Sequence, residues 1–179
     1  ISLFDYNDDV QDPAEAGFER ESNGQGIYER DAFRSSDHDP VVVGLDLNGP
    51  PVCSSAEPTV SSIWPPNHRM VDVEVIGVTD PDGDVVTIAI DSIFQDEEVD
   101  GRGSGATAPD GGGLGTSVAQ VRAERAGSGD GRVYHISFTA RDSVGNSCSG
   151  SVAVSVPMSS NGEVAVDGGP LFDSTAPES

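Results

Sequence analysis

Three aspartates alternate in a short, glycine-containing turn. Asp80, Asp82 and Asp84 stand at every second position of the segment Asp-Pro-Asp-Gly-Asp. Calcium takes about six to eight oxygen ligands, and clustered carboxylates on a short loop supply them. The spacing therefore predicts a calcium site, although it also suits an ordinary solvated hairpin turn. The remaining ligands could be main-chain carbonyls or acidic side chains that follow in the sequence: Asp96, Glu97, Glu98 and Asp100.

Other residues whose side chains could take part in catalysis or ligand binding lack the partners that this chemistry needs. His68 and His135 have no second His or Cys at zinc-ligand spacing. No Gly-x-Ser-x-Gly elbow is present, and the glycine run at 101–105 precedes no helix that would bind phosphate. Trp64 is the only tryptophan, and we interpret it as a core or edge anchor, with sugar stacking as the alternative.

The two cysteines lie far apart in the sequence, at Cys53 and Cys148. Both flank expected strands that a sandwich can bring together, which favours a disulfide over two buried thiols. In the chain-entropy model, closing so long a loop contributes roughly 4–5 kcal/mol.

The net charge of the chain limits the classes of molecule that it is expected to bind. The 179 residues include 9 basic and 31 acidic ones, which gives a net charge of −22. Such a chain is not expected to bind nucleic acid or anionic membranes by charge, and no apolar run approaches membrane-spanning length. The acidity, the absence of lysine and the cysteines together indicate an extracellular protein. Because the first residue is Ile1, we expect a processed or cut product.

The elements that must position these residues are strands. Valine greatly outnumbers leucine, and branching at Cβ favours strands over helices. Apolar and polar residues alternate over several short segments, which predicts an all-β, Ig-like antiparallel β-sandwich. The expected strands are 60–63, 70–78, 85–94, 117–124, 132–140 and 149–156. The glycine-rich segment 100–116 is expected to be a long loop that cannot order itself by burying apolar groups.

Composition divides the chain into an extended arm (1–48), a proline linker (49–51), the sandwich (52–157) and a polar tail (158–179). The arm has one convincing strand, 41–47, whose apolar residues are Val41, Val42, Val43, Leu45 and Leu47. The six expected strands are one short of a seven-stranded sandwich. The missing strand could lie at 93–99, or it could be added to an open edge by the arm strand or by tail residues 163–166.

The arm contains a recognisable sequence motif just before its strand. Ser36-Asp37-His38-Asp39-Pro40, followed by a strand, resembles the closing segment of the endonuclease/exonuclease/phosphatase superfamily, which has the DNase I-like fold. The resemblance implies that His38 would act at a scissile phosphate and that Asp37 would position the metal or the water. The other catalytic residues of that family cannot fit in the few residues before Asp37. We therefore expect the motif to be vestigial and this chain not to be an enzyme.

A second resemblance covers about residues 53–157. The strings Trp64-Pro65-Pro66-Asn67-His68 and Asp142-Ser143-Val144-Gly145-Asn146 look like those of Ig-like modules at the C-termini of secreted bacterial proteins, which resemble hyalin-repeat and cadherin-like domains. Such modules imply spacer, adhesive or assembly roles. Together, the two resemblances indicate the C-terminal end of a secreted nuclease-type protein, cut inside its catalytic domain.

These observations predict a secreted structural module whose partners are copies of itself. We expect the arm strand to complete the open sheet edge of a neighbouring copy, and head-to-tail donation of this kind builds a filament. Calcium is the only cofactor that the sequence suggests. The alternatives are an accessory part of a metal-dependent nuclease and a surface- or carbohydrate-adhesion domain that uses Trp64.

Overall fold

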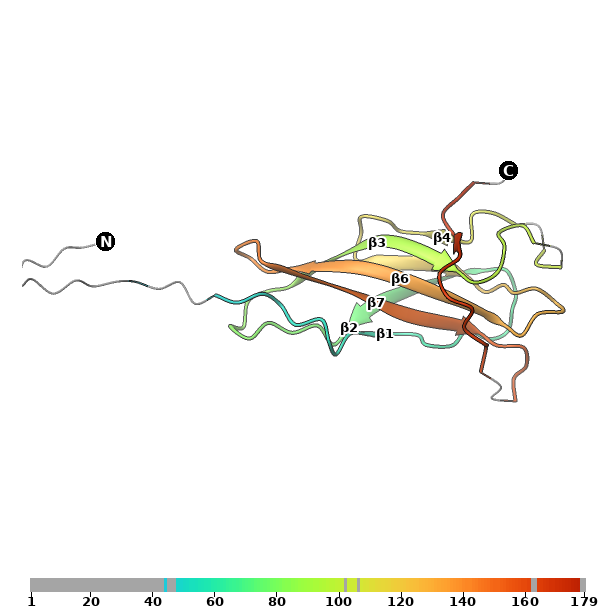
Figure 1. Ribbon diagram of the computed structural model, residues 1–179, viewed down its shortest axis with the longest axis horizontal. Helices are drawn as coiled ribbons and strands as arrows, with labels where there is room; N and C mark the ends of the chain where they lie inside the picture. The colour runs from blue at the N-terminus through green and yellow to red at the C-terminus, as the bar shows by residue number, and fades with distance from the viewer. Residues whose placement is uncertain (1–43, 45–47, 102, 106, 162–163, 178–179) are drawn as a thin grey trace, which may run out of the picture. The chain divides into compact units, whose positions relative to one another are not determined.

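The computed structural model describes residues 44, 48–101, 103–105, 107–161 and 164–177. Within this part of the chain there are eight strands and no helix, so none long and apolar enough to cross a membrane. One four-stranded sheet has the order β1-β2-β5-β4 and the other has the order β7-β6-β3-β8 (Figure 1). The first contains β1 (Glu57–Pro58), β2 (Met70–Ile76), β5 (Val118–Arg122) and β4 (Gly111–Gly112). The second contains β7 (Ser147–Val156), β6 (Arg132–Arg141), β3 (Thr87–Gln95) and β8 (Phe172–Asp173).

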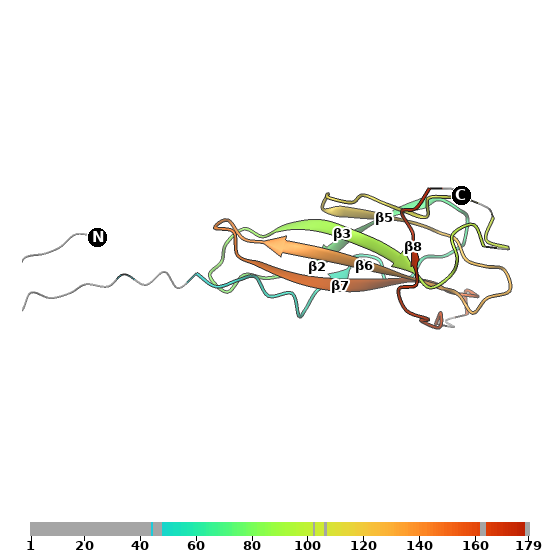
Figure 2. The ribbon, with the colours of Figure 1, turned by 45° about the horizontal axis from the view of Figure 1, so that its top comes forward.

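The predicted all-β sandwich is confirmed, and all strand pairs within the two sheets are antiparallel. The order β1-β2-β5-β4 opposite β7-β6-β3 corresponds to the two sheets of a constant-type Ig domain. The short strand β8 extends the second sheet beside β3. Figure 2 shows the two sheets as separate layers.

The core lies between the two sheets, where alternating residues of each strand point inward. Fully buried side chains come from both layers, and burying each of them contributes roughly 1.5–3 kcal/mol. They include Val73 and Val121 from the first sheet, and Ile90, Ile136, Phe138 and Val154 from the second. The alternation that predicted these strands therefore identifies the face that is buried.

Strand β3 departs from simple alternation. A register shift between Ile90 and Ser92 adds one residue relative to β6. The extra residue reverses the inward and outward phase, so Ile90 and Ile93 are both buried although they lie three positions apart. The sequence predicted the strand and its first inward residues, but not this bulge.

The expectation that segment 100–116 is a long loop that cannot order itself is wrong. It contains β4, which pairs with β5 at Val121 and Gln120, and it buries Ser104 and Asp110. The buried groups are polar and are held by hydrogen bonds, which a count of apolar side chains does not reveal.

The tail also differs from its prediction. No strand occurs at 164–166, and Glu163 lies outside the described residues. Instead, β8 pairs with Phe94 and Gln95 of β3, and the buried Ser174 accepts from the N–H groups of Asp110 and Gly111. The tail therefore belongs to the folded unit that comprises residues 48–179. The expected strand at 60–63 is reduced to an isolated parallel bridge between Ser62 and Ser155.

The sandwich has two distinct ends. What we call the linker end comprises Asn48, Gly49 and the turns at 80–84 and 142–146. What we call the tail end comprises the loops at 96–110 and 124–131 and the tail itself. Strands β3 and β7 run from the linker end to the tail end, and β6 runs back (Figure 1).

Candidate functional site

The aspartates at 80–84 hold the linker. Asp82 accepts a hydrogen bond from the N–H of Gly49 at 2.7 Å, and Asp84 accepts one from the side-chain amide of Asn48. Asp80 Oδ1 accepts from the N–H groups of Asp82 and Asp84, at 2.9 and 3.3 Å. The turn therefore acts as a clamp on the chain where it enters the domain.

The turn between β6 and β7 completes this clamp. Asp142 Oδ1 accepts from the N–H groups of Val144, Gly145 and Asn146, at 3.0, 2.6 and 2.8 Å. The side-chain amide of Asn146 donates to Asp142 Oδ2 at 2.9 Å and to Asn48 Oδ1 at 2.8 Å. Desolvation acts to raise the pKa of Asp142, but these hydrogen bonds to its charged form outweigh it and lower the pKa.

The structure does not bring the predicted calcium ligands together as a metal site. Among the described residues, no group of three His, Cys, Asp or Glu side chains is arranged to hold a metal ion. Asp82 Oδ2 and both carboxylate oxygens of Asp84 accept hydrogen bonds from N–H and O–H donors. Within the turn, Asp80 Oδ2 is buried and has no hydrogen-bond partner among the described residues. Calcium binding at this turn therefore stays a prediction of the sequence.

The four additional acidic residues lie elsewhere. Asp96, Glu97, Glu98 and Asp100 follow the C-terminal end of β3, whereas the aspartate turn precedes its N-terminal end. A strand of 9 residues spans about 30 Å, so the two groups cannot bind one ion. Asp96 instead accepts from the N–H of Val133 at 2.9 Å.

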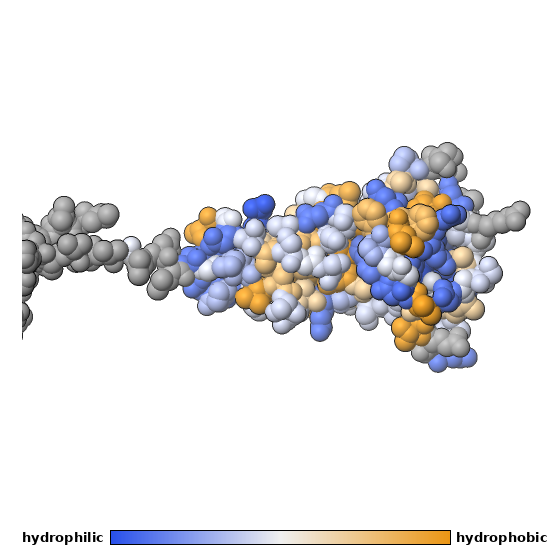
Figure 3. Space-filling model, in the orientation of Figure 1, coloured by the Kyte–Doolittle hydropathy of each residue, from blue (hydrophilic) through white to orange (hydrophobic). Residues whose placement is uncertain are grey.

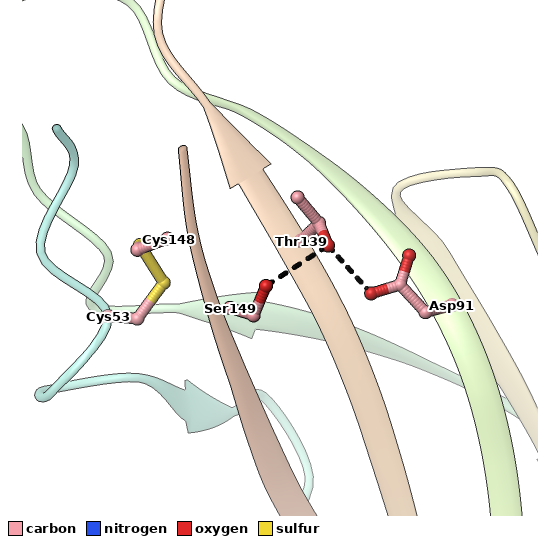
Figure 4. The surroundings of a disulfide bond; sticks show 5 residues. All are labelled: Cys53, Asp91, Thr139, Cys148 and Ser149. Carbon is pink, nitrogen blue, oxygen red and sulfur yellow. Dashed lines mark hydrogen bonds between the residues drawn. A yellow bond between two sulfur atoms is a disulfide. The ribbon is translucent and has the colours of Figure 1, made fainter. Parts of the chain in front are cut away.

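The predicted disulfide between Cys53 and Cys148 is confirmed, with a Cα–Cα distance of 5.9 Å. It fastens the first residues of the domain to the start of β7 (Figure 4). Within the described residues neither cysteine is free.

Strand β7 lies at the edge of its sheet, and most of that edge is open. On one side β7 pairs with β6 along its whole length. On the other side, Ser155 is the one residue of β7 with a backbone partner in the part of the chain that the structure describes: its N–H donates to the carbonyl of Ser61 at 3.0 Å, and its carbonyl accepts from the N–H of Ile63 at 2.8 Å. Antiparallel pairing alternates, so the backbone groups of Ser149, Ser151 and Ala153 face the same way as those of Ser155. Within the described chain they have no backbone partner.

This open stretch, residues 147–153, is named the β7 edge. It has no charged side chain, no proline and no bulge, which are the usual devices that protect edge strands from pairing with other chains. Its outward side chains are serine and alanine, and Ser149 lies beside Thr139, which donates to Asp91 at 2.8 Å (Figure 4). In a chain with net charge −22, the β7 edge carries no charged side chain.

A buried ionic network fills the tail end, and sequence reasoning did not find it. Arg132, fully buried, donates to Asp110 at 2.7 Å and to Glu97 at 3.0 Å, and lies 3.7 Å from Glu124. Arg122 reaches the same Asp110 at 3.2 Å. Glu124 lies two residues after the end of β5 and is fully buried.

Electrostatics in this network keep Arg132 charged. Burial by itself would lower the pKa of Arg132, but Tyr134, Asp110 and Glu97 around the guanidinium outweigh burial and raise the pKa. Burial raises the pKa of Tyr134. Removing the cation would leave Asp110 and Glu124 as uncompensated buried charges. The network is therefore structural in character, and no sequence pattern signals it.

Several predicted residues do not join any site. Asp37, His38 and the arm residues Val41, Val42, Val43, Leu45 and Leu47 lie outside the described residues. Trp64 is 47% exposed beside the bridge at Ser62. His135 contacts Asp167 at 2.9 Å, and hydrogen bonds from Gly169 and His135 lower the pKa of Asp167.

No family model, no curated protein and no solved structure matches this chain. The geometry described above therefore carries the functional argument.

Proposed function

We propose that this chain is a non-catalytic, secreted structural module that associates with copies of itself. In this proposal, the arm strand at 41–47 of one copy completes the β7 edge of another. The observation that supports it is the open, uncharged backbone of residues 147–153. Main-chain hydrogen bonds along such an edge supply affinity for any extended segment of suitable pattern.

The arm strand has that pattern. Val41, Val43, Leu45 and Leu47 alternate with Val42, Gly44 and Asp46, so one face of an extended strand is apolar. Its only charged residue is Asp46. It is as long as the β7 edge, so one strand can pair with the whole open stretch.

A secreted location is consistent with the disulfide. The Cys53–Cys148 bond joins residues 95 positions apart, and such structural disulfides persist in oxidising compartments. We propose an extracellular setting on this basis, and the nuclease-like arm motif agrees with it through the resemblance to secreted bacterial proteins.

Deleting residues 1–47 tests the proposal. The truncated chain is expected to sediment as a monomer and to form no filaments by electron microscopy, whereas the full chain assembles. Deleting only residues 1–36 is the matched control, because it retains the arm strand and should still assemble. Unchanged assembly after removal of 1–47 would refute strand donation.

The competing expectation, an accessory part of a nuclease, rests on the resemblance of residues 36–40. The full chain is incubated with Mg²⁺ and plasmid DNA, beside a His38→Ala variant. Cleavage that disappears in the variant would overturn the non-catalytic proposal, and no cleavage by either protein supports it.

A further inference from the structure

We infer that the tail occupies a strand-accepting edge of β3 and that the tail of a second copy can take its place there. This association site goes beyond the proposed function, because β3 and β7 lie on opposite sides of β6 in the second sheet and the tail shares no residue with the arm. Three features support the inference: the bonds that hold the tail, the side chains that it presents to the domain, and its absence from the core.

The tail is held along β3 through its main chain, as Figure 2 shows where β8 lies beside the end of β3. The N–H of Leu171 donates to the carbonyl of Gln95, and the N–H of Ser174 donates to the carbonyl of Ile93, both at 3.0 Å. The carbonyl of Ser174 accepts from the N–H of Asp110 at 2.8 Å. An extended peptide that adds a strand to a sheet edge is bound in the same way.

Two glycines of the domain make room for small side chains of the tail. A Cβ added at Gly111 would lie 2.9 Å from Cβ of Ser174, and one added at Gly131 would lie 2.6 Å from Cβ of Ala165. Both distances are well below the roughly 3.5–4.0 Å that carbon atoms in contact prefer. Ser174 and Ala165 are accordingly buried. The domain surface therefore favours a segment that has small residues at these two positions.

The large apolar side chains of the tail face solvent instead. Val164 is 82% exposed, Val166 59% and Leu171 62%, and apolar side chains are exposed at this end of the domain (Figure 3). Among the described residues, the hydrophobic core extends in sequence from Cys53 to Val156 and includes none from the tail. The tail can therefore leave β3 without opening the core, and such segments detach at a lower free energy than global unfolding requires.

Further contacts of the tail are polar and lie at the surface. His135 Nε2 is 2.9 Å from Oδ1 of Asp167, and the N–H of Gly168 donates to Asp96 at 3.2 Å. Because both pairs are exposed, water competes for the same groups when the tail leaves. These contacts orient the tail on the domain without making its docking irreversible.

The docking surface does not distinguish the tail of its own chain from that of another copy, because the two tails have the same sequence. The covalent connection gives the chain's own tail a high effective concentration, on the order of millimolar for a short flexible linker. Exchange of an identical element between two copies re-forms the same contacts and joins the copies. We therefore expect tail exchange to increase with protein concentration.

Cysteine cross-linking between two full-length variants tests the exchange. Phe94 and Asp173 are direct partners in the antiparallel pairing of β3 with β8. The Cα atoms of such partners lie about 4.5–5.5 Å apart, within the roughly 4.4–6.8 Å that a disulfide spans. One chain carries Phe94→Cys and the other carries Asp173→Cys, so docking of one copy's tail on β3 of the other brings the two thiols together. We expect a 94–173 linkage, identified by peptide mapping, whose yield increases with protein concentration.

Asp91→Cys mixed with Asp173→Cys is the matched control. Asp91 is exposed on the same strand but lies three positions from Phe94, about 10 Å along an extended strand, so a 91–173 linkage is not expected. Equal yields of the 91–173 and 94–173 linkages would indicate random collision and overturn the exchange. Absence of the 94–173 linkage at every protein concentration would overturn it as well.

Hydrogen exchange of the natural chain measures detachment without any substitution. The amides of Leu171, Ser174 and Asp110 are expected to exchange together and faster than the amide of Ile136 in β6. Exchange of all four at one rate would show that the tail opens only with the whole domain, which would overturn the inference. Association through the β7 edge leaves each tail on its own β3, so the outcome of deleting residues 1–47 neither supports nor contradicts tail exchange.

Discussion

Arg132 is the residue on which the tail end depends most. It is fully buried between two fully buried carboxylates, Asp110 and Glu124. Replacing Arg132 with Met is expected to destabilise the fold by about 3–5 kcal/mol, because both carboxylates lose their buried cation. Urea unfolding followed by Trp64 fluorescence measures the change. Arg141→Met is the control: Arg141 is exposed, and its loss should change the free energy of unfolding by about 0.5 kcal/mol or less. Equal effects of the two substitutions would contradict the role of the network.

Asp142 makes the linker end sensitive to acid. Its pKa is lowered below its ordinary value of 3.8 in the folded protein, so the unfolded chain binds its proton more readily. The stabilisation is therefore present above pH 3.8 and is lost as the pH falls through the lower folded pKa. The melting temperature is expected to fall less steeply between pH 5 and about pH 2 in Asp142→Asn than in the natural chain. Parallel melting curves for both proteins over this range would show that Asp142 is not responsible.

At the scale of elements, the disulfide joins the start of the domain to β7. The closed loop spans a sequence separation of 95 residues, so reduction is expected to lower the free energy of unfolding by up to about 4–5 kcal/mol in the chain-entropy model. Urea midpoints with and without dithiothreitol measure this. A chain with both cysteines replaced by serine should be as unstable as the reduced chain and should not respond to dithiothreitol; a response in that variant would exclude the disulfide as the cause.

The β7 edge allows a sharp test with proline. Ser151 directs its N–H away from β6, so Ser151→Pro removes no hydrogen bond within the domain but blocks one to an added strand. We expect this variant to unfold near the natural midpoint and to lose assembly. Val152→Pro is the matched control, because the N–H of Val152 faces Ile136 of β6, and its loss should cost about 3 kcal/mol of stability. Normal filaments from Ser151→Pro would rule out β7 as the acceptor.

At the scale of the whole molecule, net charge opposes association. Copies with a charge of −22 repel one another, and salt shortens the range of that repulsion from about 30 Å at 0.01 M to about 8 Å at 0.15 M. Assembly is therefore expected to increase over this salt range at fixed protein concentration, as measured by light scattering. A decrease with salt would indicate that contacts between opposite charges dominate the interface.

The amino-acid sequence determined the secondary structure and the buried face of most strands. The alternation of apolar and polar residues at 70–76, 118–122 and 132–140 involves neighbours only two positions apart. Local chemistry therefore suffices to predict it. The cysteine pair was also predictable, because both residues flank strands that a sandwich brings close.

The tertiary structure alone decided what lies at the two ends and at the edge. Asp110, Glu124 and Arg132 come from different segments, and their burial depends on partners far away in the sequence. The hydrogen bonds that Asp82 and Asp84 accept from Gly49 and Asn48 also join residues more than 30 positions apart in the sequence, so they depend on where the linker docks. Likewise, β7 has an open edge among the described residues because the order of strands in the sheet places none of them beside residues 147–153. Periodicity records which side of a strand is buried, but strand order and the pairing of buried charges are long-range properties that only the folded chain defines.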